Sequence, residues 1–198
     1  MKLILVEHAQ SVANALGINQ GHKEYELSPL GREQARKLAL RLKDEKIDFA
    51  YSSDLTRAKD TAKEILKFHS GTELVCLEEL REKNKGSYQG KHTNVLKEDL
   101  KKLGISYEDY DFKGGEKETF VRKRTLEFYE KILEKHKGKT VLVVTHGGPY
   151  VNLLLHLLGR PRKDSKICKL KSAAMTVIEV DDEGNHKIKL LSCVKHLE

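Results

Sequence analysis

The sequence predicts a three-layer α/β domain in which helices cover both faces of a mostly parallel sheet. Segments 3–6 and 141–145 are almost continuously apolar, as expected for strands buried on both faces. Helical patterns alternate with strands along the chain, and two apolar segments near the end predict an antiparallel hairpin. A chain of 198 residues is long enough for one well-buried core. We therefore predict a single domain over residues 1–198.

The elements follow from apolar spacing and from cap and turn residues. The predicted strands are 3–6, 49–51, 73–77, 141–145, 173–180 and 187–194, the last two joined by the turn 181–185. The predicted helices are 10–16, 29–45, 55–66, 119–136 and 149–158. Ser28 and Pro29 provide an N-cap and a proline at the first helical position, and segment 52–54 is expected to cap the third helix. Segment 18–26 is polar and is expected to be a loop.

The segment from 83 to 119 differs from the rest of the chain. It is polar and contains glycine, with one helical pattern at 95–103. We predict that it is an insertion covering the active site and not a separate domain.

Composition narrows the classes of partner. The net charge is +7, but basic and acidic residues alternate, as in 59–64, so nucleic-acid binding is not expected. No apolar run approaches the roughly 18 residues of a membrane span, and the first residues lack a signal-peptide pattern. The three cysteines, Cys76, Cys168 and Cys193, are far apart, which favours a reducing, cytoplasmic setting without a zinc site.

Two histidines follow the two most apolar strands. His8 and His146 each come where a buried strand ends, which is where ligands bind in open α/β sheets. A neutral imidazole can attack phosphorus, and a nearby carboxylic acid can protonate the leaving alkoxide. Arginine and glycine amides can hold phosphoryl oxygens. The groups expected to supply these functions are Arg57, Glu82, Gly147 and Gly148.

These residues stand in motifs that resemble the histidine phosphatase superfamily, which includes the cofactor-dependent phosphoglycerate mutases. The matching blocks follow one another in the family's order over nearly the whole chain. They are Glu7-His8-Ala9 in the place of Arg-His-Gly, Asn14, Gln20-Gly21, Ser52 to Ala58 with Thr61-Ala62, Leu80-Arg81-Glu82 with Gly86 and Gln89-Gly90, and Thr145 to Gly148.

The resemblance implies a phosphoglycerate mutase-like fold and assigns roles to residues. His8 would accept the phosphoryl group, Glu82 would donate the proton, and Arg57 and His146 would bind phosphate, with no metal or organic cofactor. Asn14, Gln20 and Gly21 fall at substrate-contacting positions. The short chain and Phe112 to Glu116 followed by Arg122 favour the broad-specificity phosphatase branch acting on a small phosphorylated metabolite. A phosphoglycerate mutase is the enzyme alternative, and a homodimer is an open option.

The main departure from the family pattern is Glu7, which stands where the family has arginine. A carboxylate repels phosphate, so we expect severely reduced activity. Ala9 in place of glycine is milder, provided that its φ is not positive. Three accounts remain open: an active enzyme with a compensating cation, a pseudo-enzyme that binds phosphorylated ligands, and an altered form of an active enzyme. The candidate cations are Lys23, Arg81 and Lys85.

Other titratable residues lack a functional pattern. His22 and the remaining histidines show no metal-ligand spacing, which argues against a metallohydrolase, and are expected to be surface or packing residues. Arg122 and Arg124 are expected to be solvated, with the alternative that one of them reaches the substrate.

Overall fold

Six strands form one sheet in the order β3-β2-β4-β1-β5-β6 in the computed structural model, which describes residues 1–168 and 170–198. Strands β1 to β4 are parallel where they pair, and β5 is antiparallel to both β1 and β6. The prediction of a mostly parallel sheet with a C-terminal antiparallel hairpin is confirmed. The strands are β1 (Lys2–Glu7), β2 (Phe49–Ser53), β3 (Leu74–Leu77), β4 (Thr140–Thr145), β5 (Met175–Val180) and β6 (His186–Cys193).

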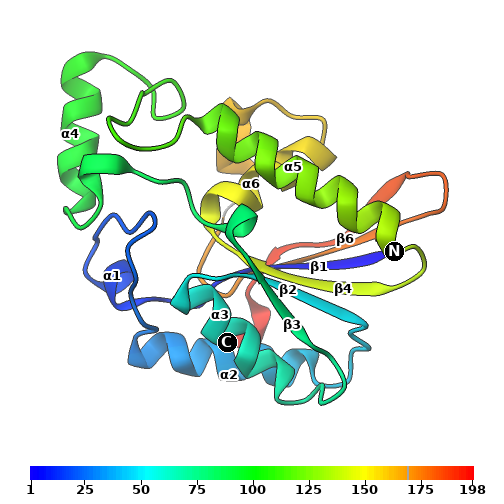
Figure 1. Cartoon of the computed structure of the whole chain (residues 1–198). Helices are drawn as coiled ribbons and strands as arrows, with labels where there is room; N and C mark the ends of the chain where they lie inside the picture. The colour runs from blue at the N-terminus through cyan, green and yellow to red at the C-terminus, as the bar shows by residue number, and fades with distance from the viewer. Residues whose placement is uncertain (169) are drawn as a thin grey trace.

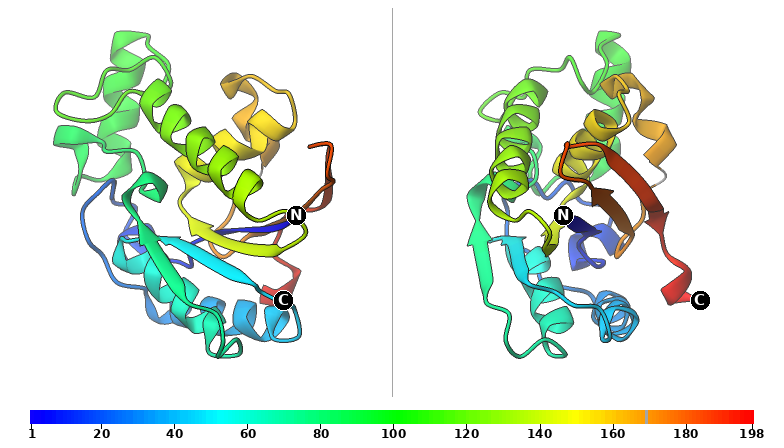
Figure 2. Two further views of the ribbon diagram at one scale, coloured as in Figure 1. Left: turned by 45° about the vertical axis from the view of Figure 1, so that its right-hand side comes forward. Right: turned by 90° about the vertical axis from the view of Figure 1, so that its right-hand side faces the viewer.

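Helices lie on both faces of this sheet, as Figure 1 and the two views of Figure 2 show. One face is covered by α2 (Pro29–Leu42) and α3 (Thr56–Leu66), and the other by α5 (Glu118–Lys135) and α6 (Gly147–Leu157). The remaining helices are α1 (Val12–Ala15), α4 (Thr93–Leu103) and the short 3-10 turns η1 (Glu78–Leu80), η2 (Gly86–Tyr88), η3 (Arg162–Cys168) and η4 (Lys195–Leu197).

The alternation of side chains along β1 explains why its sequence is continuously apolar. Leu3 and Leu5 belong to the core under α5 and α6, whereas Ile4 and Val6 belong to the core over α2 and α3. Glu7 continues the series of Leu3 and Leu5, so its side chain is directed to the α6 side at the end of the strand. The buried strand therefore places a carboxyl group at its own C-terminal end, within the sheet.

The start of α2 follows the prediction, whereas the start of α3 does not. The Ser28 hydroxyl accepts a hydrogen bond from the Gly31 amide at 3.0 Å, with Pro29 at the first position. For α3 the N-cap is Leu55, which has no side-chain cap, because β2 extends to Ser53 and buries both serines in the sheet. The Thr56 amide instead donates to the Glu24 carboxyl at 2.9 Å. The expected cap from segment 52–54 was wrong.

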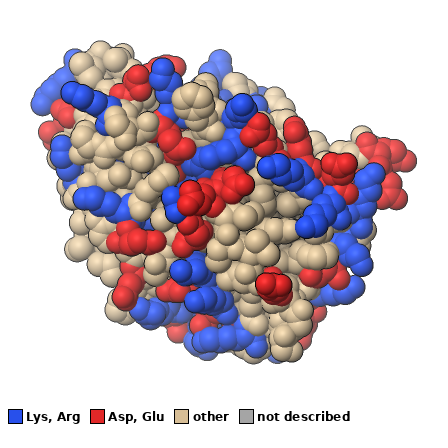
Figure 3. All heavy atoms as spheres, in the orientation of Figure 1, with Lys and Arg blue, Asp and Glu red and all other residues tan. Residues whose placement is uncertain are grey.

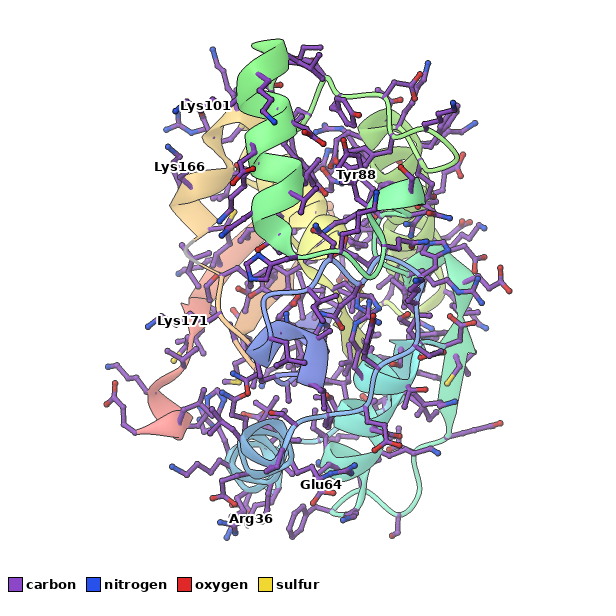
Figure 4. All side chains as sticks on the ribbon, turned by 90° about the vertical axis from the view of Figure 1, so that its left-hand side faces the viewer. Arg36, Glu64, Tyr88, Lys101, Lys166 and Lys171 are labelled. Carbon is purple, nitrogen blue, oxygen red and sulfur yellow. The ribbon has the colours of Figure 1, made fainter. Side chains whose placement is uncertain are left out.

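The segment 83–119 has its own small cluster of buried side chains. Tyr88, Leu96 and Phe112 form this cluster, and Figure 4 shows Tyr88 in the interior beside α4. Segment 89–93 also pairs by backbone hydrogen bonds with 17–19, the stretch that follows α1. In Figure 1, α1 and α4 both lie on the left, at the side toward which β1, β2 and β4 run. The segment thus stands beside the ends of the strands that carry His8 and His146.

The surface carries charges of both signs. Lys and Arg are intermixed with Asp and Glu over the face drawn in Figure 3, without a broad basic patch there. None of the helices in the described part of the chain combines the length and apolar character needed to cross a bilayer.

Candidate active site

His8 follows β1 and is almost completely buried. Its Nδ1 lies 2.7 Å from the carbonyl oxygen of Ala9, and because a carbonyl only accepts, Nδ1 carries the proton. Burial, together with the nearby Arg57 guanidinium, lowers the pKa of His8 to about 3. The ring is therefore neutral at neutral pH, with the lone pair on Nε2 available for attack.

His146 lies beside His8 because β1 and β4 are neighbours with Glu7 opposite Thr145. The two ring centroids are 5.0 Å apart, in an edge-to-face arrangement. Both ring nitrogens of His146 are buried without a hydrogen-bond partner. Burial, then the charge of Arg57, lowers the pKa of His146 well below its ordinary value. The fold thus joins two neutral imidazoles from distant parts of the chain.

Arg57 lies in the first turn of α3 and is fully buried. Its guanidinium donates to the carbonyl oxygens of Gly21 at 2.8 Å and of Lys23 at 3.2 Å. Gly21 has φ of +54°, a conformation that glycine adopts without strain. Burial lowers the pKa of Arg57, while the charges of Glu82 and Glu7 raise it. The loop after α1 therefore holds a buried cation against the two histidines.

Glu82 follows η1 and is held by the start of α6. Its carboxyl accepts hydrogen bonds from the amide of Gly148, at 3.2 Å to Oε1, and from its neighbour Lys83, at 2.7 Å. A Cβ on Gly148 would lie 2.4 Å from Glu82 Oε1, so a side chain there would displace the Glu82 carboxyl. Gly147 is the first residue of α6, where a Cβ would also face Glu82. The free amides of a helix N-terminus hold the carboxyl in place.

Glu7 and Ala9 flank His8 in different ways. Ala9 is fully buried, and its amide donates to Thr61 Oγ1 at 3.1 Å. Its φ is not among the positive ones of the described non-glycine residues, so alanine fits. Glu7 Oε1 lies 3.5 Å from His8 Nε2, while its buried Oε2 has no partner. Burial first, then the charge of Glu82, raises the pKa of Glu7 well above its usual range.

None of the three cations considered as compensation for Glu7 forms an ion pair with it in the described residues. Arg81 binds Asp54 at 2.8 Å, and Lys85 Nζ lies 3.5 Å from the Asn19 side chain. Lys23 Nζ lies next to Gly90. His8 is the ion-pair partner recorded for Glu7, and its lowered pKa leaves it uncharged at neutral pH.

Two predicted substrate contacts are engaged elsewhere. Asn14 Oδ1 accepts from the Ser11 amide at 3.0 Å, and together they form the capping box of α1. Gln20 Oε1 accepts from the Ser11 hydroxyl at 2.7 Å. Both side chains thus brace the turn after His8 in this structure.

Two side chains, those of Arg124 and His22, converge on the backbone carbonyl of Glu82. Arg124 donates to the Glu82 carbonyl at 3.1 Å and to Glu116 at 3.1 Å, and His22 donates to the same carbonyl at 2.8 Å. The expectation that Arg124 is solvated was wrong: its side chain is 17% exposed because Glu116 and the η1 turn enclose it. His22, which was expected to be a surface or packing residue, is partly buried and packs against the backbone of Glu82.

Glu116 also closes the base of segment 83–119. Its carboxyl accepts from the Asn84 amide at 2.8 Å, and its own amide donates to the Asn84 carbonyl at 2.9 Å. Although burial opposes it, hydrogen bonds from His22, Asn84 and Arg124 lower the pKa of Glu116 to about 2. The GGE pattern at 114–116 was the available sequence signal, but nothing in it indicated these partners.

Lys83 is a further buried residue that the sequence did not single out. Its Nζ lies 3.4 Å from Glu118 and stands over the rings of Tyr107 and Phe112. Burial lowers its pKa, and Glu118 opposes this shift. Within the described residues, no group of three His, Cys, Asp or Glu side chains is arranged to hold a metal ion.

A neutral imidazole beside a buried guanidinium, with a carboxyl group on a helix N-terminus, is a site suited to phosphoryl transfer. Residues 3–192 match the family model of the histidine phosphatase superfamily (branch 1), and the chain belongs to this family. Its members among the relatives are named phosphatases and mutases, which supports phosphatase or mutase activity.

Individual relatives cover nearly the whole chain. The chain is 33% identical over 204 residues to phosphoglycerate mutase-like protein 4 of Arabidopsis thaliana, covering 100% of this chain and 87% of that protein. It is 36% identical over 191 residues to the metal-independent phosphoserine phosphatase of the same plant, covering 92% and 77% respectively. Among solved structures it resembles Bacillus stearothermophilus YhfR, with a TM-score of 0.91, 27% identity and coverage of 100% and 99%.

Proposed function

We propose that this chain cleaves phosphomonoesters through a phosphohistidine intermediate on His8. The observation that carries the proposal is the neutral His8 ring, whose Nε2 is free for attack while Nδ1 donates to the Ala9 carbonyl at 2.7 Å. Arg57 supplies a buried positive charge next to it. The family membership supports the same chemistry.

The proposed reaction has two steps. His8 Nε2 forms a bond to phosphorus as the bond to the ester oxygen breaks, and protonated Glu82 gives its proton to the leaving alkoxide. In the second step Glu82, now a carboxylate, takes a proton from water, whose oxygen attacks phosphorus as the P–N bond breaks. Arg57 and His146 stabilise the charge on the transferred group. No step requires a metal.

We further propose that Glu7 severely reduces the rate in this chain. One unit-charge interaction at about 4 Å and an effective dielectric constant of 20 is worth roughly 4 kcal/mol. Losing half of that from the transition state costs roughly 30-fold in rate. The carboxyl at 3.5 Å from His8 Nε2 also favours a second candidate, a weakly catalytic protein that binds phosphorylated ligands.

The finer features of the proposal rest on the relatives and on composition. Relatives named phosphoserine phosphatases and a phosphoglycerate mutase support a small phosphorylated metabolite as substrate and keep mutase-type transfer as the enzymatic alternative. The free thiols of Cys76, Cys168 and Cys193 support a cytoplasmic setting. A homodimer stays a prediction, which light scattering tests. Coverage of the site by segment 83–119 is also part of the proposal.

The test compares hydrolysis of p-nitrophenyl phosphate, in EDTA, by the unaltered chain, Glu7→Arg and Glu7→Arg/His8→Ala. We expect Glu7→Arg to raise the rate at least 30-fold and the added His8→Ala change to abolish it. Trapping of labelled phosphate on His8 in the Glu7→Arg protein checks the intermediate. Rapid turnover by the unaltered chain would contradict the role of Glu7, and inactivity of Glu7→Arg toward phosphoserine and phosphoglycerate as well would contradict the enzymatic proposal.

A further inference from the structure

The Glu7 carboxyl is buried without the donors that a buried carboxylate needs. The residue is 8% exposed, and Oε2 has no hydrogen-bond partner. Its other oxygen, Oε1, lies 3.5 Å from His8 Nε2, a nitrogen that carries no proton while Nδ1 donates to Ala9. Burying an ionised carboxylate without compensating hydrogen bonds is costly, so the group is suited to hold a proton.

The charged groups around Glu7 come from each neighbouring element. Glu82, after η1, acts on it as a like charge, and Arg57, on α3, is the cation that acts on it. Tyr150 on α6 is electrostatically coupled to Glu7, and its own pKa is raised to about 12, first by burial, so it is neutral. His146, beside His8, is also neutral at physiological pH. Glu7 therefore faces one like charge and one opposite charge.

A phosphoryl group attacked by His8 must share this space. Its phosphorus has to come within about 3–3.5 Å of Nε2, the atom from which Glu7 Oε1 is 3.5 Å away. A phosphate dianion and an ionised Glu7 would by themselves bring three negative charges against the single positive charge of Arg57, with the carboxyl group of Glu82 also close by. Two acidic groups forced into one site cannot both ionise fully, and they retain a proton between them. The histidines do not compete for it, because their pKa values are depressed.

We propose that Glu7 makes the pocket take up a phosphoryl group together with one proton, held in an O–H···O hydrogen bond between Glu7 and a phosphoryl oxygen. The species bound is then the hydrogen-phosphate form of a phosphomonoester or the dianion with protonated Glu7, which have the same composition. This inference rests on the proposed phosphate-binding function of the pocket. It makes Glu7 a specificity-determining residue that selects the protonation state of the ligand.

The consequence is a characteristic dependence of affinity on pH. Phosphomonoesters lose their second proton near pH 6. Once both free Glu7 and the free ligand are ionised, each pH unit should raise the dissociation constant about tenfold, since binding must recover one proton. An arginine at the same position would favour the dianion, so the affinity of Glu7→Arg should fall as the pH drops below the second pKa of the ligand.

The experiment is calorimetric titration of the full chain with inorganic phosphate between pH 5 and pH 9.5, in buffer pairs of different ionisation enthalpy. The unaltered chain should bind more weakly as pH rises, with uptake of close to one proton at the alkaline end. Glu7→Gln, which has the same shape but cannot ionise, should show neither effect in that range. Glu7→Arg should show the reversed trend.

The outcomes separate this inference from the proposed function. If the unaltered chain and Glu7→Gln have the same pH dependence and proton uptake, the inference is wrong, whatever the activity of Glu7→Arg. If none of the three proteins binds phosphate, the pocket is not a phosphate site, and both the inference and the proposed function fall. Unfolding curves of the three proteins, recorded at each pH, show that binding is compared between folded states.

Discussion

Replacing Glu116 by glutamine removes a charge from the group that joins Asn84, Arg124 and His22 behind Glu82, the proposed proton donor. Glutamine retains the shape and one acceptor oxygen, but its NH2 group would face N–H donors that the second oxygen now accepts from. The pKa of Glu116 lies at about 2 in the folded protein, against an ordinary value of 4.5. At about 1.4 kcal/mol per pH unit, this difference corresponds to roughly 3 kcal/mol of stability at pH 7.

The sign and the pH range of this contribution follow from linkage. Because the pKa is lower in the folded protein, the unfolded chain binds more protons below 4.5, and the contribution is lost as the pH falls toward 2. It should therefore be complete above about pH 5 and about half of its full size near pH 3. The variant should differ most from the unaltered protein at neutral pH.

Urea unfolding of the unaltered chain and Glu116→Gln at pH 7, 5, 4 and 3 measures this directly. Glu134→Gln, a change at an exposed glutamate on α5, serves as the control and should cost under about 0.5 kcal/mol at every pH. A difference below about 0.5 kcal/mol for Glu116→Gln at pH 7, or one that is constant down to pH 3, would refute the reasoning.

Three further predictions concern packing, ionisation and metals. Gly31→Ala should lower the free energy of unfolding in urea by about 1–3 kcal/mol, because the new Cβ would lie 1.9 Å from the Gln10 carbonyl oxygen. Gly71→Ala is the control and should be nearly neutral, because Gly71 has open space around it. Glu7→Gln should stabilise the protein increasingly as the pH rises above 4.5, because folded Glu7 holds a proton that the unfolded chain releases. The gain should be up to about 1.4 kcal/mol per pH unit until the pKa of Glu7 in the folded protein is passed. Unfolding at pH 5 and pH 8 checks this, and an equal difference at the two pH values would contradict it. EDTA should leave any phosphatase activity of Glu7→Arg unchanged, and loss of activity restored by a divalent metal would contradict the metal-free mechanism.

The sequence was sufficient for the layers of the fold because its strongest signals are local. The apolar runs 3–6 and 141–145 mark the two central strands, and the histidines that follow them are brought together by the pairing of β1 with β4. The same reasoning misplaced the cap of α3, because no local pattern shows that Glu24, 32 residues away, supplies the acceptor for Thr56.

The contacts that hold the site residues in place could not be predicted either, because they also join residues that are far apart in the sequence. Arg124 and His22 resemble solvated residues in the sequence. They become half-buried only because they meet Glu82 and Glu116 behind η1. Asn14 and Gln20 were placed by resemblance at substrate contacts, and in the structure they bind Ser11. Sequence patterns located the side chains that the fold brings together but not the contacts that hold them.

The paired hydrogen bonds between Asn84 and Glu116 have a consequence for changes in the length of the segment between them. They close the intervening segment at a narrow base, where a Cβ on Gly115 would lie 2.5 Å from the Asn84 carbonyl. A loop closed at its base can change length at a small entropic cost, since each doubling costs only about 0.6 kcal/mol. A change in the length of the loop between Asn84 and Glu116 can therefore be absorbed within the loop, while the strands that hold the two histidines stay unaltered.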